Sequence, residues 1–228
     1  MPSTYAHFRF GQEVYKELLP KCRTVIDAFR PLYDIGLHGP DILFYYHALQ
    51  PNAVSAVGFE AHERPGRDFF LRAAGILRQS GKAELAYIYG VLCHFALDVS
   101  CHAYVNRKIR ESGISHTEIE GEFDRSLMIA DGLNPVAHCQ TGHIVPSREN
   151  AEVIALFYDG VTADNVRTAL RMTALLARGL SSHSAFVGLM RRTSRHKGSG
   201  RSLALRAMRA SIARSGCAPA SKKRFTMR

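Results

Sequence analysis

Polar residues interrupt the most apolar part of the chain at a regular interval. The stretch Tyr87–Asp124 opens with a run of Leu, Ile, Val, Phe, Tyr and Ala, within which His94, Asp98 and His102 recur every four residues. Residues four apart lie above one another on an α-helix, so these three side chains share one face. A helix that is apolar nearly all round is typically buried, and an unpaired carboxylate there is costly. The pattern therefore predicts a buried helix whose polar face meets a cation.

The remaining hydrophobic pattern is also helical. Amphipathic helices are predicted over Gln12–Leu19 and Lys21–Arg30, meeting at Pro20. The other expected elements are a loop over Gln50–Pro65, helices over Asp68–Gln79, Asn150–Tyr158 and Thr162–Leu180, and a helix through Glu120 that ends near Ala130. The sequence has no strand-like alternation of useful length. It predicts an all-α fold, a compact multi-helix bundle.

Helix geometry indicates a site with more than one metal ion. Eight residues of unbroken helix rise about 12 Å, whereas zinc bonds to nitrogen or oxygen are about 2 Å long. His94 and His102 therefore cannot bind the same ion, but Asp98 lies between them and could bridge two ions. After a short break, His116 and Glu120 repeat the four-residue interval. The spacing predicts a polynuclear metal site.

Two simpler explanations of these residues are less consistent with the pattern. A single buried histidine is more often a hydrogen-bonded core residue than a ligand, but five ligand-type residues at this spacing need a partner for their charge. A transmembrane helix is the other explanation. The apolar run Leu85–Leu97 is shorter than the roughly 20 residues that a span requires, and His94 interrupts it. We therefore expect a metal site and no transmembrane segment.

The motif HFALDVSCHAYVN, followed by SHTEIEGEFD, resembles the zinc-dependent phospholipase C family, whose fold is shared with zinc-dependent single-strand nucleases. That family has a long helix with His-x-x-x-Asp, another His, and then His-x-x-x-Glu. The resemblance implies one domain over residues 1–190 around a cleft that holds two or three zinc ions. It implies eight metal ligands: His7, Asp41, His62, His94, Asp98, His102, His116 and Glu120.

The resemblance also implies how these ligands are shared. Asp98 would bridge two ions, the first of which His7 also binds. The second ion would take three further ligands: Asp41, His62 and His94. The third ion would be held by His102, His116 and Glu120. Imidazole and carboxylate donors without thiolate suit zinc, and by donor type Mn²⁺ or Fe²⁺ could compete.

Asp41 is the candidate catalytic residue. In the family, a Pro-Asp after a glycine matches a metal-binding Asp that also orients the attacking water. Taken alone, Asp41 after Pro40 reads as a first-turn carboxylate favoured by the helix dipole. The chain departs from the secreted members of the family in two ways. The spacing from Asp98 to His102 is two residues shorter, and no Trp is present to supply their N-terminal ligand.

Cysteines and the N-terminus indicate a reduced, cytoplasmic protein. The five cysteines are odd in number and have no paired spacing. The opening MPSTYAHFRFG lacks the basic region and apolar run of a signal peptide.

The positive charge of the chain is concentrated at its C-terminal end. Of the 30 Lys and Arg, 12 lie in Arg191–Arg228, which has no Asp or Glu. The other residues carry 18 basic against 20 acidic side chains, a net charge of −2. We expect residues 191–228 to form a basic, disordered tail that could bind anionic lipid or nucleic acid. The sequence does not indicate an oligomeric state.

A zinc cluster of this kind suits phosphoester hydrolysis, because the ions acidify a coordinated water and stabilise charge on phosphate oxygens. The resemblance implies a hydrolase that cleaves phosphodiester bonds, phospholipase C-like, on a phospholipid or related substrate. A single-strand nuclease would need aromatic stacking platforms near the metals, for which Phe44, Tyr45 and Tyr46 are candidates. A non-catalytic metal-binding or regulatory protein is the alternative from another class, if the missing N-terminal ligand leaves the cluster incomplete.

Overall fold

The computed structural model describes residues 4–181, and every element in that part of the chain is helical. In chain order they are α1 (Thr4–Glu17), α2 (Pro20–Ala28), α3 (Arg30–Gly36), the 3₁₀ helix η1 (Gly39–Tyr45), α4 (Ala53–Glu63), α5 (Gly66–Leu77), α6 (Lys82–Ser112), α7 (His116–Ala130), α8 (Arg148–Ala155) and α9 (Ala163–Ser181). The all-α prediction is confirmed. The expected domain boundary at residue 190 and the basic tail 191–228 lie outside the described residues.

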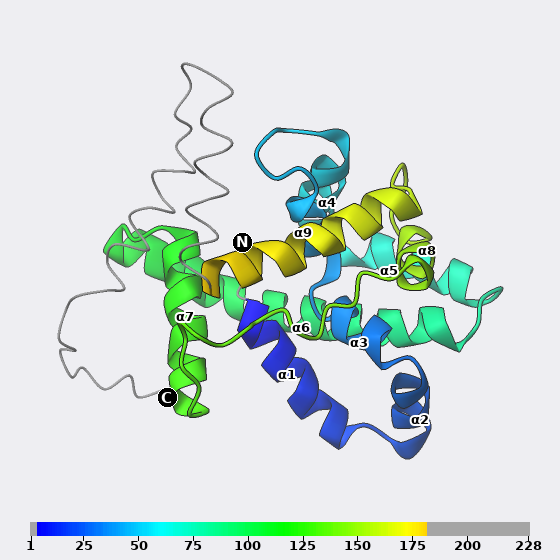
Figure 1. Ribbon diagram of the computed structural model, residues 1–228, viewed down its shortest axis with the longest axis horizontal. Coiled ribbons are helices and arrows are strands. Elements are labelled where there is room, and N and C mark those ends of the chain that lie inside the picture. Colours follow the sequence, from blue (N-terminus) through cyan, green and yellow to red (C-terminus); the bar gives the residue numbers. More distant parts are fainter. Residues whose placement is uncertain (1–3, 182–228) are drawn as a thin grey trace. The chain divides into compact units, whose positions relative to one another are not determined.

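The long helix α6 lies across the middle of the bundle (Figure 1). It contacts α1, α2, α3, α5, α7, α8 and η1. Its N-terminal half is buried in the main core through Tyr87, Ile88 and Val91. The helix is unbroken from Lys82 to Ser112, as the argument for separate ions on one face requires. The histidines and the carboxylate of this helix are therefore carried by an element that the core holds in place.

Helices α3 and α6 cross at very close range. A Cβ atom added at Gly90 would lie 2.3 Å from the backbone oxygen of Tyr33 and 2.8 Å from Cα of Gly36. A glycine at position 90 is therefore what allows the two backbones to touch. Because of this contact, α3 and the turn that leads from it into η1 pack against the face of α6 that continues to His94.

Replacing Gly90 should show this directly. Gly90→Ala is expected to lower the free energy of unfolding by roughly 2 kcal/mol or more, because the new methyl group meets rigid backbone. Gly75 in α5 is the matched control, since a Cβ there meets nothing within 4 Å. Gly75→Ala should raise stability by about 0.5–1 kcal/mol, the usual gain in a helix interior. Urea unfolding of both variants measures the difference, and equal stabilities would contradict the close crossing.

Several predicted boundaries differ from the structure. The first helix begins at Thr4 rather than Gln12, and therefore carries the candidate ligand His7. The predicted helix Lys21–Arg30 ends at Ala28, because Phe29 leaves helical geometry with φ −134° and α3 starts after it. The predicted loop Gln50–Pro65 is wrong: it contains α4. The side chain of Asn52 caps that helix by accepting the N–H of Ser55 at 2.8 Å.

One helix in the described part of the chain, α6, is long and apolar enough to cross a membrane by length and composition. The core helix of a soluble protein can have the same length and apolar composition. The N-terminal half of α6 packs in the main core, although only 33% of its most apolar 18-residue window is buried. The absence of a transmembrane segment stays a prediction.

Candidate metal centre

The carboxylate of Asp98 lies among four imidazoles. Its oxygens are 3.2 Å from Nε2 of His7, 3.5 Å from Nε2 of His94, 3.8 Å from Nε2 of His62 and 3.9 Å from Nδ1 of His102. These histidines come from α1, α4 and both sides of Asp98 on α6. Asp98 is thus the geometric centre of the cluster, as expected for a bridging ligand.

All eight candidate ligands fall into three groups whose donor atoms lie within 4.8 Å of one another. The groups are His7 with Asp41 and His94, His62 with His94 and Asp98, and His102 with His116 and Glu120. The third group is the one implied by the family resemblance. The first two differ from the implied layout in that Asp41 and His94 also come within reach of His7. Whether these residues ligate metal stays a prediction, but the fold brings every one of them to the cluster.

Two of the histidines are oriented by a hydrogen bond from Nδ1. Nδ1 of His62 lies 2.8 Å from the carbonyl oxygen of Gly58, and Nδ1 of His102 lies 2.8 Å from the carbonyl oxygen of Asp98. A carbonyl oxygen only accepts, so each Nδ1 donates its proton. Nε2 is therefore the nitrogen of each ring that is left to bind a metal ion. Such a hydrogen bond from the second ring nitrogen is what holds and orients a metal-binding imidazole. Burial alone would lower the pKa of His62, but the Asp41 carboxylate beside Nε2 raises it to about 9, so a metal ion would displace a proton there.

The other two histidines around Asp98 are deeply buried. Within the described residues, the Nδ1 atoms of His7 and His94 are inaccessible and have no hydrogen-bond partner. Burial, with the nearby His7 imidazole, lowers the pKa of His94 to about 4, so its ring is neutral near pH 7. Burial alone would raise the pKa of Asp98, but the hydrogen bond from His7 and the nearby imidazoles lower it to about 2. An ionised carboxylate beside the neutral ring of His94, with the buried Nδ1 atoms of His7 and His94 unsatisfied, fits a bound zinc ion.

Asp41 enters the cluster from a tight turn. Gly39 has φ +50°, and a Cβ atom there would lie 2.5 Å from the ring of His94. Glycine followed by Pro40 therefore lets η1 start directly against α6. This places the carboxylate of Asp41, whose side chain is only 11% exposed, 2.9 Å from Nε2 of His62. His62 lies on α4 rather than in the predicted loop.

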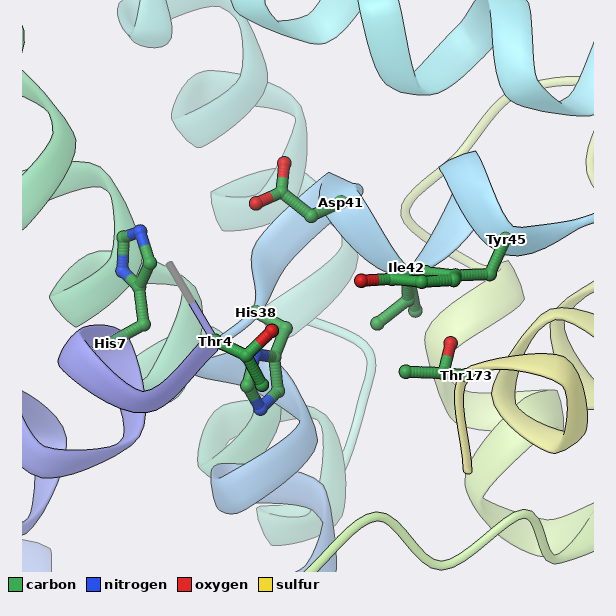
Figure 2. A pocket seen from close by; sticks show the side chains of 7 residues that line it. All are labelled: Thr4, His7, His38, Asp41, Ile42, Tyr45 and Thr173. Carbon is green, nitrogen blue, oxygen red and sulfur yellow. The ribbon is translucent and has the colours of Figure 1, made fainter. Parts of the chain in front are cut away.

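A small cavity separates Asp41 from α1. Figure 2 shows His7 and Asp41 facing this space from two different elements, together with His38 and Tyr45. Its volume is about 10 Å³, close to the minimum for one water molecule. The cavity therefore has room for about one water-sized species between His7 and Asp41.

The third group forms where α6 ends and α7 begins. Gly113 ends α6 in the left-handed region, with φ 68°, and Ser115 caps α7. The chain can therefore turn sharply enough to bring α7 beside α6. Nε2 of His116 then lies 2.6 Å from Oε1 of Glu120, and the rings of His102 and His116 are 5.3 Å apart between centroids.

Asp124 is a contributor that the sequence analysis did not identify. It follows Glu120 by one helical turn and is 5% exposed. Its two carboxylate oxygens accept the backbone N–H groups of Tyr5 at 3.0 Å and Ala6 at 2.8 Å. A carboxylate here also complements the helix dipole at the start of α1. Asp124 therefore ties the first turn of α1, which carries His7, to the helix that carries Glu120.

Removing this charge should release His7 from the cluster. Asp124→Asn is expected to lower the metal content of the protein by up to one ion per chain while His116 and Glu120 still bind theirs. Asp131, directly after α7, offers a matched control, because it binds side chains of α1 rather than its backbone: the guanidinium of Arg9 and the hydroxyl of Tyr5. Asp131→Asn should keep the full metal content. Elemental analysis checks both, and an unchanged metal content in Asp124→Asn would contradict the positioning role.

A second buried pair supports the same region. Nε2 of His38 lies 2.6 Å from Nε2 of His143, and the His143 ring stacks on Phe8 with centroids 4.0 Å apart. Burial, with the neighbouring His143, lowers the pKa of His38, and burial likewise lowers that of His143 to about 4. Two neutral rings can share one proton in a hydrogen bond. The pair fixes the loop after α7 against α1 and the turn before η1.

An open cleft of about 250 Å³ adjoins the cluster. One part of its lining consists of candidate ligands: His62, His94, Asp98 and His102. The other part is mainly apolar, with Phe69 and Phe70 from α5 and Phe95 and Val99 from α6, and Arg64 also lines it. The cluster is thus accessible from one side to a molecule that has both polar and apolar parts.

Comparison with known proteins agrees with this geometry. A family model described as zinc dependent phospholipase C matches residues 6–165, a range that contains all eight candidate ligands. Searches of curated proteins and of solved structures give no match. The match spans well over half of the chain, and the all-α fold is the one that this family requires. The chain belongs to the zinc-dependent phospholipase C family.

Proposed function

We propose that the protein hydrolyses a phosphodiester bond, with a phospholipid or a related phosphodiester as substrate. The family supports a zinc-dependent hydrolase. The observation that favours a phospholipid is the cleft, which joins a cluster of imidazoles and carboxylates to a wall of aromatic and aliphatic side chains. A headgroup phosphate would meet the polar part, and the first carbons of an acyl chain would meet the apolar part.

The residues of the cluster would hold zinc and organise the reacting groups. Zinc supplies an acidified water and positive charge for the phosphate oxygens. The ionised carboxylate of Asp98 would balance the charge of the cations. The Nδ1 hydrogen bonds of His62 and His102 orient these rings and would leave Nε2 of each to bind an ion. Asp41, in the first turn of η1, is the proposed acceptor of the proton that the attacking water loses.

Arg64 supplies a positive charge at the edge of the cleft. Its guanidinium is 3.0 Å from Glu60, an exposed pair that is worth little in water and is easily exchanged for a phosphate. A guanidinium matches two phosphate oxygens at once. We infer that Arg64 contributes to headgroup binding and not to the chemical step.

Two of the three aromatic residues proposed for nucleic-acid stacking are placed unfavourably. Phe44 is 9% exposed and stacks on Phe59 with centroids 4.4 Å apart, so its ring is occupied by packing. Tyr45 lines the small cavity beside Asp41, and burial, with the nearby Asp41 charge, raises its pKa to about 12. Phe44 and Tyr45 are therefore not available to stack on bases. A cytoplasmic location and binding of anionic lipid through the basic tail stay proposals.

Parallel assays separate the candidates. Purified, zinc-loaded protein would be tested against a phosphatidylcholine emulsion, single-stranded DNA and bis(p-nitrophenyl) phosphate. Release of a phosphorylated headgroup, with no DNA cleavage, is the expected result. Preferential cleavage of DNA would favour the nuclease instead. A fully metal-loaded protein that turns over none of the three would favour a non-catalytic metal-binding role.

A further inference from the structure

One face of α6 is apolar and largely exposed, although Phe95 on it contacts Phe70 of α5 with ring centroids 5.4 Å apart. Between positions 92 and 103, the exposed residues of this helix are apolar except for Ser100, whose hydroxyl donates to the carbonyl of Ala96 at 2.7 Å. Leu92, Phe95 and Val99 are 43%, 40% and 62% exposed. We name this face the α6 stripe, defined by Leu92, Phe95, Ala96, Val99 and Ala103. Its spacing of three and four residues keeps these side chains on one side of the helix.

The stripe is continuous with the cleft. Phe95 and Val99 are both exposed and both line the cleft next to Asp98. The start of α5 abuts the stripe, because a Cβ atom at Gly66 would lie 2.3 Å from the ring of Phe95. A surface that covered the stripe would therefore also reach the mouth of the cleft.

Basic side chains flank the stripe. The same face of α6 continues one turn beyond Ala103 to Arg107 and Arg110, both exposed. The guanidinium of Arg107 lies 5.4 Å from the ring centroid of Tyr104, which is 41% exposed. Arg64 lies on the cleft side. An apolar face with basic and aromatic residues at its edge has the composition of a helix that lies in a lipid–water interface.

We propose that the α6 stripe is a lipid-binding surface that seats the open cleft on a bilayer containing anionic phospholipid. This inference rests on the proposed function, because a lipid-binding surface would bring a substrate that lies in a membrane to the metal cluster. The positive charge at the edge of the stripe favours anionic lipid as its partner. A second copy of the chain would instead bring another positively charged edge against this one. The helix would lie at the surface, with its buried face still packed in the bundle.

The test compares exposed positions that do not line the cleft. Leu92→Glu and Ala96→Glu place a carboxylate in the stripe, and both positions are exposed on a helix that tolerates Glu. Leu156→Glu is the matched control, since Leu156 is 51% exposed next to α8 and does not line the cleft. Co-sedimentation of the full chain with vesicles of phosphatidylcholine and phosphatidylserine measures binding. Because every variant keeps the basic tail, differences in vesicle binding between the variants come from the stripe.

Each stripe variant is expected to bind these vesicles at least about tenfold more weakly than wild type, whereas the control stays within about twofold. Wild-type melting temperature and metal content in every variant would show that the fold is intact. Equal binding by stripe variants and wild type, or no binding by wild type, would overturn the proposal. A wild-type dimer that Leu92→Glu dissociates would assign the stripe to a second copy and also overturn it. None of these readouts requires turnover, so failure of the proposed hydrolysis is detected separately, by the emulsion assay.

Discussion

Asp98→Asn is expected to lose metal and stability together. The carboxylate lies within 4 Å of four imidazoles, and only 14% of the side chain is exposed. The amide has one acceptor oxygen and no charge, so it cannot balance two cations. Each ion bound at a thousandfold excess over its dissociation constant adds about 4 kcal/mol to the free energy of unfolding. In a chain of this size the loss of one ion should lower the melting temperature by about 10 °C.

The control for this variant is a buried carboxylate outside the cluster. Asp34 is 7% exposed and is paired with Arg30 at 2.8 Å and with Gln12 at 3.2 Å. Asp34→Asn should also lose some stability, but it should keep the wild-type metal content. Elemental analysis and calorimetry on both variants separate the two effects. If Asp98→Asn retained all of its metal, the bridging role would be wrong.

Asp41→Asn is expected to separate chemistry from structure. Asp41 lies at the start of η1, where the remaining ligands of its group still hold an ion and an amide oxygen can replace the carboxylate oxygen. Metal content and melting temperature should therefore stay near wild type. Loss of the proton acceptor should lower the turnover of a phosphodiester by about 10²-fold or more, the usual effect of a positioned base.

Asp68 is the matched control for the simpler interpretation of Asp41. Asp68 is an exposed carboxylate in the first turn of α5 and lies outside the cluster. If Asp41 were only a helix-start carboxylate, Asp41→Asn and Asp68→Asn would have similar, small effects on turnover and stability. Wild-type turnover by Asp41→Asn would remove the proposed base. A large loss of metal in Asp41→Asn would show that its role is structural.

The part of the site that lies on one helix could be predicted from local spacing. The four-residue interval from His94 to His102, repeated by His116 and Glu120, is a property of helix geometry alone. His7, Asp41 and His62 are different, because nothing in their immediate sequence distinguishes them. They reach the cluster through packing between elements far apart in the chain, and only the family resemblance pointed to them.

Other features escaped the sequence analysis for identifiable physical reasons. Asp124 binds backbone N–H groups of Tyr5 and Ala6, and a hydrogen bond between a side chain and distant backbone leaves no pattern in the sequence. A signal existed, since Asp124 extends the interval of His116 and Glu120 by one more turn. Helix α4 was missed because its hydrophobic periodicity is weak. Asn52 before it and Pro65 after it were the available start and stop signals.

The close fit of η1 against α6 was also beyond the sequence analysis. The need for glycine at position 39 comes from the ring of His94, which occupies the space that a Cβ atom would need. The local sequence does not show this contact. A glycine and a proline indicate only that the chain turns. The direction of that turn, and therefore the placement of Asp41 near His62, comes from the crossing of α3 and α6.

The most direct test of the account is the number of metal ions in the purified protein. Elemental analysis of the full chain, expressed with zinc and freed of loosely bound metal, should give at least two zinc-class ions per chain. The expected value follows from the rise of α6 between His94 and His102 and from the position of Asp98 between two groups of ligands. One ion or none in a metal-replete, folded protein would contradict the polynuclear centre.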